Sequence, residues 1–317
     1  MMKVDVAVQS YKKPESMIYT LLSLKKYCGE CIDTIYVDDD CSDDGTVEYY
    51  DDHLREALAP IRLEVRINRK RSLYTKTLMT KKLFRKKRFA EKLRLLGHMP
   101  IKRLRWMPTE DDIRYQWAIQ KTDKPFIMLI HDDIKFFDNV VAVYLAAMEA
   151  DDQLAIVGDL GGSKRCPFGP CGENCSPLKI LEGQYPCQAW PITGRLSMIH
   201  TILGRYKRNC RINEWCCMLR VDVARKLTDQ YGICFGNYEG GGDVGTYWFE
   251  KIIKLGYHFT DPLPTPEMRK NYYLHWWQGH EGHQVWVDYN GNGKAKYEKE
   301  FIVDCIKNEF QFEVHSH

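Results

Sequence analysis

One stretch decides the fold of this chain: Phe126-Ile127-Met128-Leu129-Ile130-His131-Asp132-Asp133. Five apolar residues in a row predict a strand that is buried on both faces, as in the interior of a parallel sheet. The two adjacent carboxylates repel each other, and a divalent cation held between them and a ligand relieves that repulsion. The pair is therefore a candidate metal site, although an aspartate at this position can equally cap the helix that follows.

Strands and helices alternate on both sides of this stretch. We predict strands over residues 4–8, 34–37, 63–67 and 154–157, and a strand followed by a helix over 214–227. We predict further helices from Pro14, after Asp44-Gly45-Thr46, and over residues 111–120, 140–148 and 244–255. This alternation predicts an α/β fold with a mostly parallel, twisted sheet flanked by helices.

A second group of acids follows a different predicted strand. Asp38, Asp39 and Asp40 come directly after the apolar residues 34–37. Because ligands of such sheets bind at the carboxyl ends of the strands, both acidic groups are expected at one edge. A carboxylate there can accept hydrogen bonds from a base or from ribose hydroxyls. The alternative is a solvated acidic turn.

Length and composition set the outer limits. A length of 317 residues is enough for one large α/β domain or two small ones. The hydrophobic fraction of 44% is ordinary for a globular protein with a buried core. No stretch approaches the roughly 18–20 apolar residues of a membrane-spanning helix. The first residues enter a strand pattern without a charged leader and apolar run, so we expect a cytoplasmic protein.

Basic residues are concentrated in one segment. Residues 69–105 hold 15 of the 46 Lys and Arg residues and one acid, Glu91. The remainder has 31 basic and 42 acidic residues, a balance of −11. Such segregation predicts an anionic partner. We expect a helical insertion that docks peripherally at the inner face of an anionic membrane, with Leu83, Phe84, Phe89 and Leu93 inserting. A solvated arm, nucleic acid and the phosphate groups of a small ligand remain alternatives.

Twelve cysteines are scattered along the chain. Four of them, at 166, 171, 175 and 187, lie in a Gly- and Pro-rich segment over residues 158–206 that we expect to be irregular. Zinc takes four sulfur or nitrogen ligands, so Cys166, Cys171, Cys175 and Cys187 are a candidate structural zinc site. Reduced thiols are the alternative, because these spacings match no common zinc module.

Several segments, taken in order, resemble family-2 GT-A glycosyltransferases. The opening Val6-Ala7-Val8-Gln9-Ser10-Tyr11-Lys12-Lys13-Pro14 resembles the start of that family. Residues 35–46 are similar to its "VVDDGSTDGT" segment with one extra residue, and 126–133 lie where its metal motif lies. Residues 111–118, 214–223 and 241–257 resemble later segments, so the likeness spans about residues 3–275. Gly242 replaces a common acid, and the metal motif reads His-Asp-Asp instead of Asp-X-Asp.

The resemblance implies a domain division and an activity. It implies a GT-A (Rossmann-like) catalytic domain over residues 1–275, including the basic insertion 69–110 and the Cys-rich segment 158–206, and a C-terminal extension over 276–317. The implied reaction is metal-assisted, inverting transfer of a sugar from a nucleotide-diphosphate sugar, with UDP favoured. The implied acceptor is a hydroxyl of a glycan or of a lipid-linked molecule.

The resemblance also implies residue roles. Those that would bind the nucleotide sugar are Gln9, Ser10, Tyr11, Asp38, Asp39, Arg114 and Asp132. Asp133 would be the main ligand of Mn²⁺ or Mg²⁺, with Asp132 and His275 as further ligands, and Asp243 would be the catalytic base. His275 can instead simply pack beside Trp276 and Trp277.

Two other functions stay open from the sequence. The first is a nucleic-acid-binding protein that uses the basic segment, and the second is a nucleotidyltransferase on the same fold. The basic segment carries few aromatic residues for base stacking and no recognised nucleic-acid motif, so no nucleic acid is expected as a partner.

Overall fold

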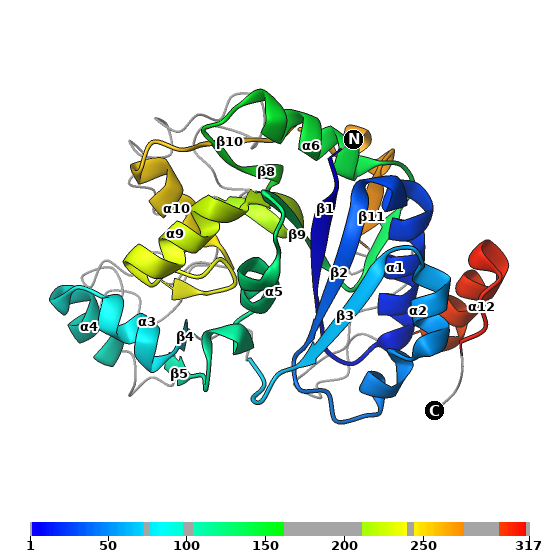
Figure 1. Ribbon diagram of the computed structural model, residues 1–317, viewed down its shortest axis with the longest axis horizontal. Coiled ribbons are helices and arrows are strands. Elements are labelled where there is room, and N and C mark those ends of the chain that lie inside the picture. Colours follow the sequence, from blue (N-terminus) through cyan, green and yellow to red (C-terminus); the bar gives the residue numbers. More distant parts are fainter. Residues whose placement is uncertain are drawn as a thin grey trace, which may run out of the picture.

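A computed structural model describes residues 2–72, 77–97, 104–161, 211–239, 244–275 and 298–314. Its centre is a seven-stranded sheet in the order β10-β8-β9-β6-β1-β2-β3 (Figure 1). The strands are β1 (Val4–Ser10), β2 (Ile32–Asp39), β3 (Arg62–Ile67), β6 (Phe126–His131), β8 (Leu154–Gly161), β9 (Arg211–Arg220) and β10 (His258–Thr260).

Six strands of this sheet run in one direction. β1 pairs in parallel with β2 and β6, β2 with β3, and β8 with β10. β9 is antiparallel to both of its neighbours, β6 and β8. The predicted mostly parallel α/β sheet is therefore confirmed, and the direction of β9 is the feature that the sequence pattern did not predict.

Helices cover both faces of the sheet. One face carries α1 (Pro14–Cys28), α2 (Asp52–Leu58), α6 (Val140–Ala150) and α12 (Lys299–Phe310); the other carries α5 (Gln116–Lys121), α9 (Val221–Tyr231) and α10 (Thr246–Lys254). Side chains alternate between the two cores along a strand. In β1, Val6 and Val8 belong to the first core, and Ala7 between them belongs to the second.

The predicted helix over residues 111–120 is shorter than expected. Residues Glu110–Asp112 form one 3-10 turn, Tyr115 is left-handed with φ 61°, and α5 begins only at Gln116. The carboxylate of Asp112 explains the delay, because it accepts hydrogen bonds from the backbone and hydroxyl of Thr109 and pairs with Arg66. These local bonds compete with helical ones.

The described part of the basic segment is built into the fold. It contains β4 (Thr77–Met79), which pairs in parallel with β5 (Leu104–Trp106), and the helices α3 (Lys81–Lys86) and α4 (Phe89–Leu96). Leu83 and Leu95 are buried in a third apolar cluster that also includes Met79 and Cys234. The segment is therefore helical in part, as predicted, and it packs beside α9.

Two small elements complete the chain. β7 (Ile134–Phe136) pairs antiparallel with β11 (Tyr273–His275), which is preceded by α11 (Pro266–Lys270). Helix α12 packs on α1, and its residues Ile302 and Ile306 are buried in the first core. Among the described helices, none has the length and apolar character needed to cross a membrane.

Candidate metal centre

The ends of three neighbouring strands bring the polar residues together. Ser10 of β1 is aligned with Asp39 of β2, and Gln9 is aligned with His131 of β6. Because these strands are parallel, the residues that follow them lie at the same edge of the sheet. The two acidic groups found in the sequence therefore meet there, as predicted.

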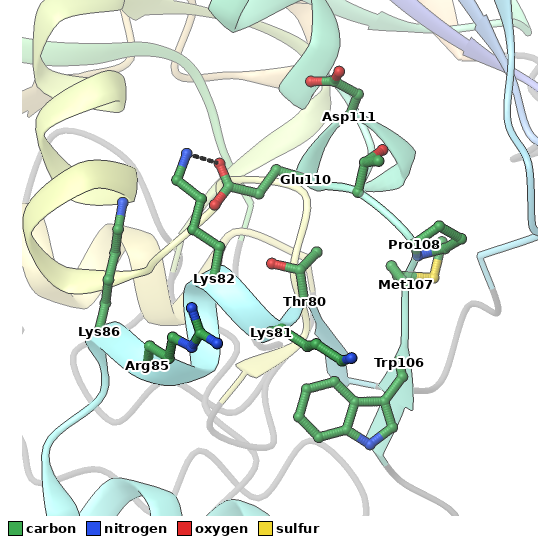
Figure 2. Close-up of a pocket in the computed structure, with 11 residues that line it drawn as sticks. Thr80, Lys81, Lys82, Arg85, Lys86, Trp106, Met107, Pro108, Glu110 and Asp111 are labelled. Carbon is green, nitrogen blue, oxygen red and sulfur yellow. Dashed lines mark hydrogen bonds and ion pairs between the residues drawn. The ribbon is translucent and has the colours of Figure 1, made fainter.

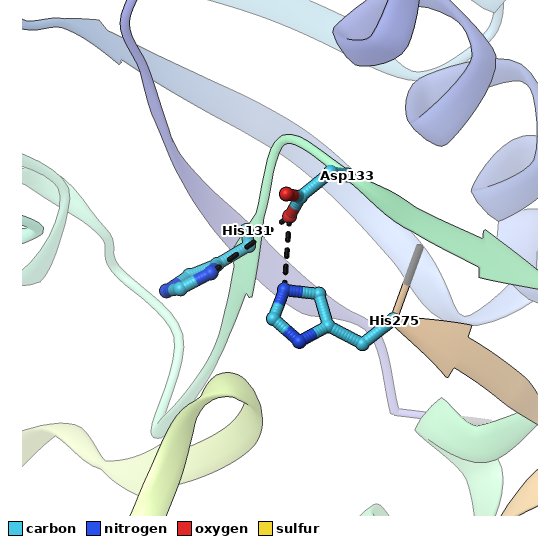
Figure 3. Close-up of side chains that lie close together, drawn as sticks. All are labelled: His131, Asp133 and His275. Carbon is cyan, nitrogen blue, oxygen red and sulfur yellow. Dashed lines mark hydrogen bonds and ion pairs between the residues drawn. The ribbon is translucent and has the colours of Figure 1, made fainter. Parts of the chain in front are cut away.

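A second strand pair adds a residue that is distant in sequence. β11 pairs with β7 so that His275 lies opposite Ile134, directly after Asp133. His275 Nε2 lies 3.1 Å from Asp133 Oδ1, and His131 Nδ1 lies 3.8 Å from the same oxygen (Figure 3). Potential ligand atoms of these three residues all lie within 4.8 Å of one another. His275 therefore lies beside Asp133, with His131 next to them, and the metal-binding roles of Asp133 and His275 remain predictions.

The surroundings set the protonation of these groups. Burial disfavours the charged form of Asp133, but Lys13 and His275 outweigh it and lower the pKa of this carboxyl. Burial, followed by the neighbouring His275, lowers the pKa of His131 to about 3. At neutral pH, therefore, Asp133 is ionised and His131 is neutral, which are the states in which both can bind a metal.

The donor set fits a divalent metal ion. Two imidazole rings and one carboxylate suit first-row ions such as Mn²⁺ or Zn²⁺, whereas Mg²⁺ prefers oxygen ligands. Asp132 points elsewhere, since its carboxylate accepts from Lys13 Nζ at 2.9 Å and from the backbone N–H of Tyr11 at 3.4 Å. Asp132 as a ligand remains a prediction.

Lys13 is the buried cation of this site. It has a left-handed backbone, φ 64°, just before α1, and its ammonium group lies 2.9 Å from Asp132 Oδ1 and 3.5 Å from Asp133 Oδ2. A charge buried this deeply requires a partner, and Lys13 has two. Lys13 thereby compensates the repulsion between the adjacent carboxylates.

The two acids at the end of β2, Asp38 and Asp39, have different partners. Asp38 forms an ion pair with Arg66 at 3.1 Å, and burial raises the pKa of its carboxyl well above the usual range. Asp39 accepts hydrogen bonds from the backbone N–H of Ser42 at 2.7 Å and from its hydroxyl at 2.8 Å. Both carboxylates therefore shape the edge of the sheet internally, and their role toward a nucleotide stays a prediction.

Asp40 and its neighbours form another part of the edge. Asp40 accepts from the backbone and hydroxyl of Ser72, and burial raises the pKa of its carboxyl to about 6 although Arg114 opposes this. The Arg71 guanidinium lies 3.9 Å from the centroid of the Tyr11 ring, which is a cation–π contact. The side-chain amide of Gln9 is buried with no hydrogen-bond partner within the described residues. Buried amides are normally hydrogen-bonded, so the side chain of Gln9 is expected to have a partner.

The backbone of Arg114 packs closely against Gly236. A side chain at Gly236 would put its Cβ 2.3 Å from the carbonyl oxygen of Arg114, so only glycine allows this approach. The guanidinium of Arg114 lies 6.0 Å from the Tyr238 ring and acts electrostatically on Asp40. Arg114 is thus directed to the same edge as Gln9, Ser10 and Tyr11.

Other predicted site residues lie outside the described residues. They are Asp243 and the four cysteines Cys166, Cys171, Cys175 and Cys187. Residues on both sides of segment 240–243 contact the basic segment. Glu239 pairs with Lys87 at 2.8 Å, and the hydroxyl of Tyr247 donates a hydrogen bond to Glu91 at 2.9 Å. The catalytic base and the zinc site remain predictions.

Sequence reasoning missed three polar residues at this edge. His131 and Lys13 stand inside the quoted motifs but were given no role. Glu214 was missed as well: its Oε1 lies 3.8 Å from His131 Nε2, and it pairs with Arg211 at 3.0 Å. Because β9 runs antiparallel, its first residues reach the edge where the parallel strands end. The signal available was three polar residues, Arg211, Asn213 and Glu214, at the start of a buried strand.

Comparisons with known proteins give likenesses in structure only. No known protein family matches the chain by sequence, and no curated protein does. Solved structures of similar arrangement include a mannosyltransferase from Pyrobaculum calidifontis in complex with GDP-Man and Mn²⁺, at 13% identity, with 83% of this chain and 55% of that chain covered and a TM-score of 0.45. Another is S. aureus TarS 1–349 in complex with UDP-GlcNAc, at 12% identity, 84% and 61% coverage and a TM-score of 0.40.

A third similar structure is core-mannan synthase A from Aspergillus fumigatus in its Mn/GDP form, at 10% identity, 87% and 75% coverage and a TM-score of 0.39. The chain spans 55% to 61% of the length of the first two of these structures. With TM-scores below 0.5, these likenesses carry no conclusion about activity, which has to come from the residues of the site.

Proposed function

We propose that this protein is a glycosyltransferase of the GT-A type, which transfers a sugar from a nucleotide-diphosphate sugar to an acceptor hydroxyl. The observation that carries the proposal is the convergence of His131, Asp133 and His275 at the carboxyl edge of a mostly parallel sheet. A metal-binding group at that edge, beside residues suited to a nucleotide, is the arrangement that such a donor requires.

The metal side of the proposal uses three residues. His131, Asp133 and His275 would hold Mn²⁺, which neutralises the charge that develops on the leaving diphosphate. Lys13 lies between Asp132 and Asp133 and compensates their negative charge before the donor arrives. Asp132 would then be available to help orient the donor or complete the metal site.

The nucleotide side uses the part of the edge formed by Gln9, Tyr11, Asp40 and Arg114. Tyr11, with Arg71 stacked on its ring, offers a flat surface to a base. The buried amide of Gln9 can both donate to and accept from a base or ribose. Asp40 adds an acidic group, and Arg114 adds a basic group. UDP is the nucleotide that we favour, on the family resemblance stated for residues 6–46.

Acceptor activation is assigned to Asp243, which would remove the proton of the attacking hydroxyl in a single displacement with inversion. The acceptor that we favour is a glycan or a lipid-linked molecule. Glu239 is the nearest described acid in sequence, but its carboxylate is buried against Lys87. This engagement makes Glu239 a weaker candidate for the base than Asp243.

A thermal-shift series tests the proposal. We expect UDP to raise the melting temperature in the presence of Mn²⁺ and to have a much smaller effect in its absence, with GDP and CMP as comparators. A screen for slow hydrolysis of nucleotide sugars then identifies the donor. Asp133→Ala should lose the Mn²⁺-dependent shift, whereas the surface variant His258→Gln should keep it. Equal shifts with and without Mn²⁺, or none with any nucleotide, would contradict the proposal.

A further inference from the structure

Helix α4 presents its apolar side chains to solvent. Phe89, Leu93 and Leu96 are 77%, 55% and 43% exposed and follow the i, i+4, i+7 spacing of one helix face. The opposite face carries Leu95, which is buried, and Glu91, whose carboxylate accepts from Tyr247. A surface helix normally buries its apolar stripe and exposes its charges, so α4 has an apolar stripe that the described residues leave open.

The structure corrects the residues expected to insert into a membrane. Leu83 is buried in the third apolar cluster, and the ring of Phe84 packs edge-on against Trp106 at 5.5 Å. Both face the protein. The exposed ridge consists of Phe89, Leu93 and Leu96, and we call these three residues the α4 ridge.

Cations surround the α4 ridge. Between residues 81 and 97 the chain has eight Lys and Arg residues and one acid, Glu91. That acid is used internally, since it also accepts from the backbone N–H of Arg88 at 2.9 Å. The exposed cations of this stretch include Arg88, directly before Phe89, and Arg94, directly after Leu93. Further along α3, Lys81, Lys82 and Arg85 line a cavity of about 1140 Å³ with Trp106 (Figure 2).

We propose that the α4 ridge docks this protein onto an anionic lipid bilayer. Apolar side chains enter the boundary between headgroups and acyl chains, while the surrounding cations pair with lipid phosphates and carboxylates. Nucleic acid would use the cations but has no place for exposed aliphatic side chains on its phosphate backbone. A second copy would cover the ridge but would bring two cationic rims together. An anionic bilayer suits both the apolar and the charged part of the surface.

The position of the ridge gives docking a consequence for the reaction. Lys87, just before α4, is paired with Glu239, and Glu91 within α4 is bonded to Tyr247. These contacts hold α4 against the residues on both sides of segment 240–243, which carries Asp243. Docking would therefore hold Glu239 and Tyr247 near the bilayer, on the side from which a lipid-linked acceptor would approach. This second step rests on the proposed function, whereas docking itself does not.

Vesicle flotation of the full chain tests docking directly. We expect it to float with vesicles of phosphatidylcholine and phosphatidylserine, to bind more weakly as salt rises, and not to float with phosphatidylcholine alone. The charge variant Arg88→Gln/Arg94→Gln should bind about 30-fold more weakly, at roughly fivefold per cation. The ridge variant Phe89→Ser/Leu93→Ser/Leu96→Ser should lose at least about tenfold.

Matched controls separate docking from general charge and hydrophobicity. Lys3→Gln/Lys307→Gln removes two exposed cations elsewhere, and Met2→Ser/Ile67→Ser/Met268→Ser removes the other large exposed apolar side chains found among the described residues. Both controls should float like the wild type, as long as thermal unfolding shows that every variant is folded.

Several outcomes would overturn the proposal. They are equal flotation with neutral vesicles, no flotation with anionic vesicles at low salt, and controls that lose as much binding as the α4 variants. Displacement from vesicles by a short duplex DNA would assign the surface to nucleic acid. A dimer in gel filtration that the ridge variant abolishes would assign it to a second copy. Because no donor is present in these measurements, docking and the proposed function can fail independently.

Discussion

Charged residues are arranged in opposite ways in two regions of this molecule, the edge of the sheet and helix α4. At the edge of the sheet, Lys13 is buried between Asp132 and Asp133, and Arg66 is shared by Asp38 and Asp112. On α4, by contrast, Arg88 and Arg94 are exposed beside apolar side chains that are also exposed. The first region has opposite charges in contact, and the second has like charges around an uncovered apolar ridge.

The difference separates two kinds of recognition. Buried charges must be compensated within the fold, so they can hold a few ligand atoms in fixed positions. Exposed like charges attract an extended anionic surface and need no fixed geometry. The sheet edge is thus suited to a small donor, and α4 is suited to a broad partner. The four predictions below test the first region, in order of decreasing effect.

The largest effect is expected from Asp133→Ala. This change removes the carboxylate that lies between His131 and His275, so Mn²⁺ would be lost from the site. We expect transfer, or donor hydrolysis, to fall on the order of 10³-fold, because the charge of the leaving group is no longer neutralised. Activity assays and a calorimetric Mn²⁺ titration measure both consequences. Wild-type transfer by the folded variant would refute the metal assignment.

The next effect is expected from Asp243→Asn. A general base acts in the transition state, so turnover should fall on the order of 10²-fold while donor affinity stays near the wild-type value. Glu239→Gln is the comparison, since breaking its buried pair with Lys87 should lower stability first. Steady-state kinetics with a separate donor-binding titration distinguishes the two. Loss of donor affinity alone would point away from Asp243 as the base.

Lys13→Met should couple stability to metal. Without the ammonium group, two adjacent buried carboxylates lose their compensating charge, which should cost about 3–5 kcal/mol in the free energy of unfolding. Mn²⁺ should recover part of this loss, so its stabilising effect should exceed that on the wild type. Urea unfolding with and without Mn²⁺ gives both values. An unchanged free energy of unfolding would mean that Lys13 does not compensate the pair.

Asp40→Asn should change the pH dependence of stability. The pKa of Asp40 is raised to about 6 in the folded protein, so the folded state holds this proton more tightly than the unfolded state. The free energy of unfolding therefore falls as pH rises from about 4 to 6, by up to about 3 kcal/mol for this one group. The variant should lose this component and be more stable than the wild type at neutral pH.

Urea unfolding at several pH values measures the effect of Asp40→Asn, and Asp152→Asn on the exposed surface is the control. If both variants keep the wild-type pH profile between about 4 and 6, burial of Asp40 does not govern that range. A simultaneous loss of nucleotide affinity in Asp40→Asn would place this residue in the donor site.

Much of the architecture could be predicted because it depends on local pattern. The apolar run of β6 and the alternating residues of β1 each predict their strands without knowledge of the rest. The prediction of a helix over residues 111–120 was wrong at its start, because Asp112 bonds to Thr109 and to Arg66. Arg66 is 46 residues away in the sequence. Residues Leu83 and Phe84 were wrongly expected at the surface, since helical spacing alone does not say which face packs against β4, β5 and α9.

The sequence by itself determined the order of strands and helices, the acids at the ends of β2 and β6, and the cation-rich segment. All of these depend on residues that are neighbours in the chain. Only the tertiary structure brought His275 to Asp133, through the pairing of β11 with β7. It alone turned β9 so that Glu214 approaches His131, and it alone left Phe89, Leu93 and Leu96 uncovered. The physical reason is that strand direction, distant pairing and burial are settled by contacts between residues far apart in sequence, which no local pattern records.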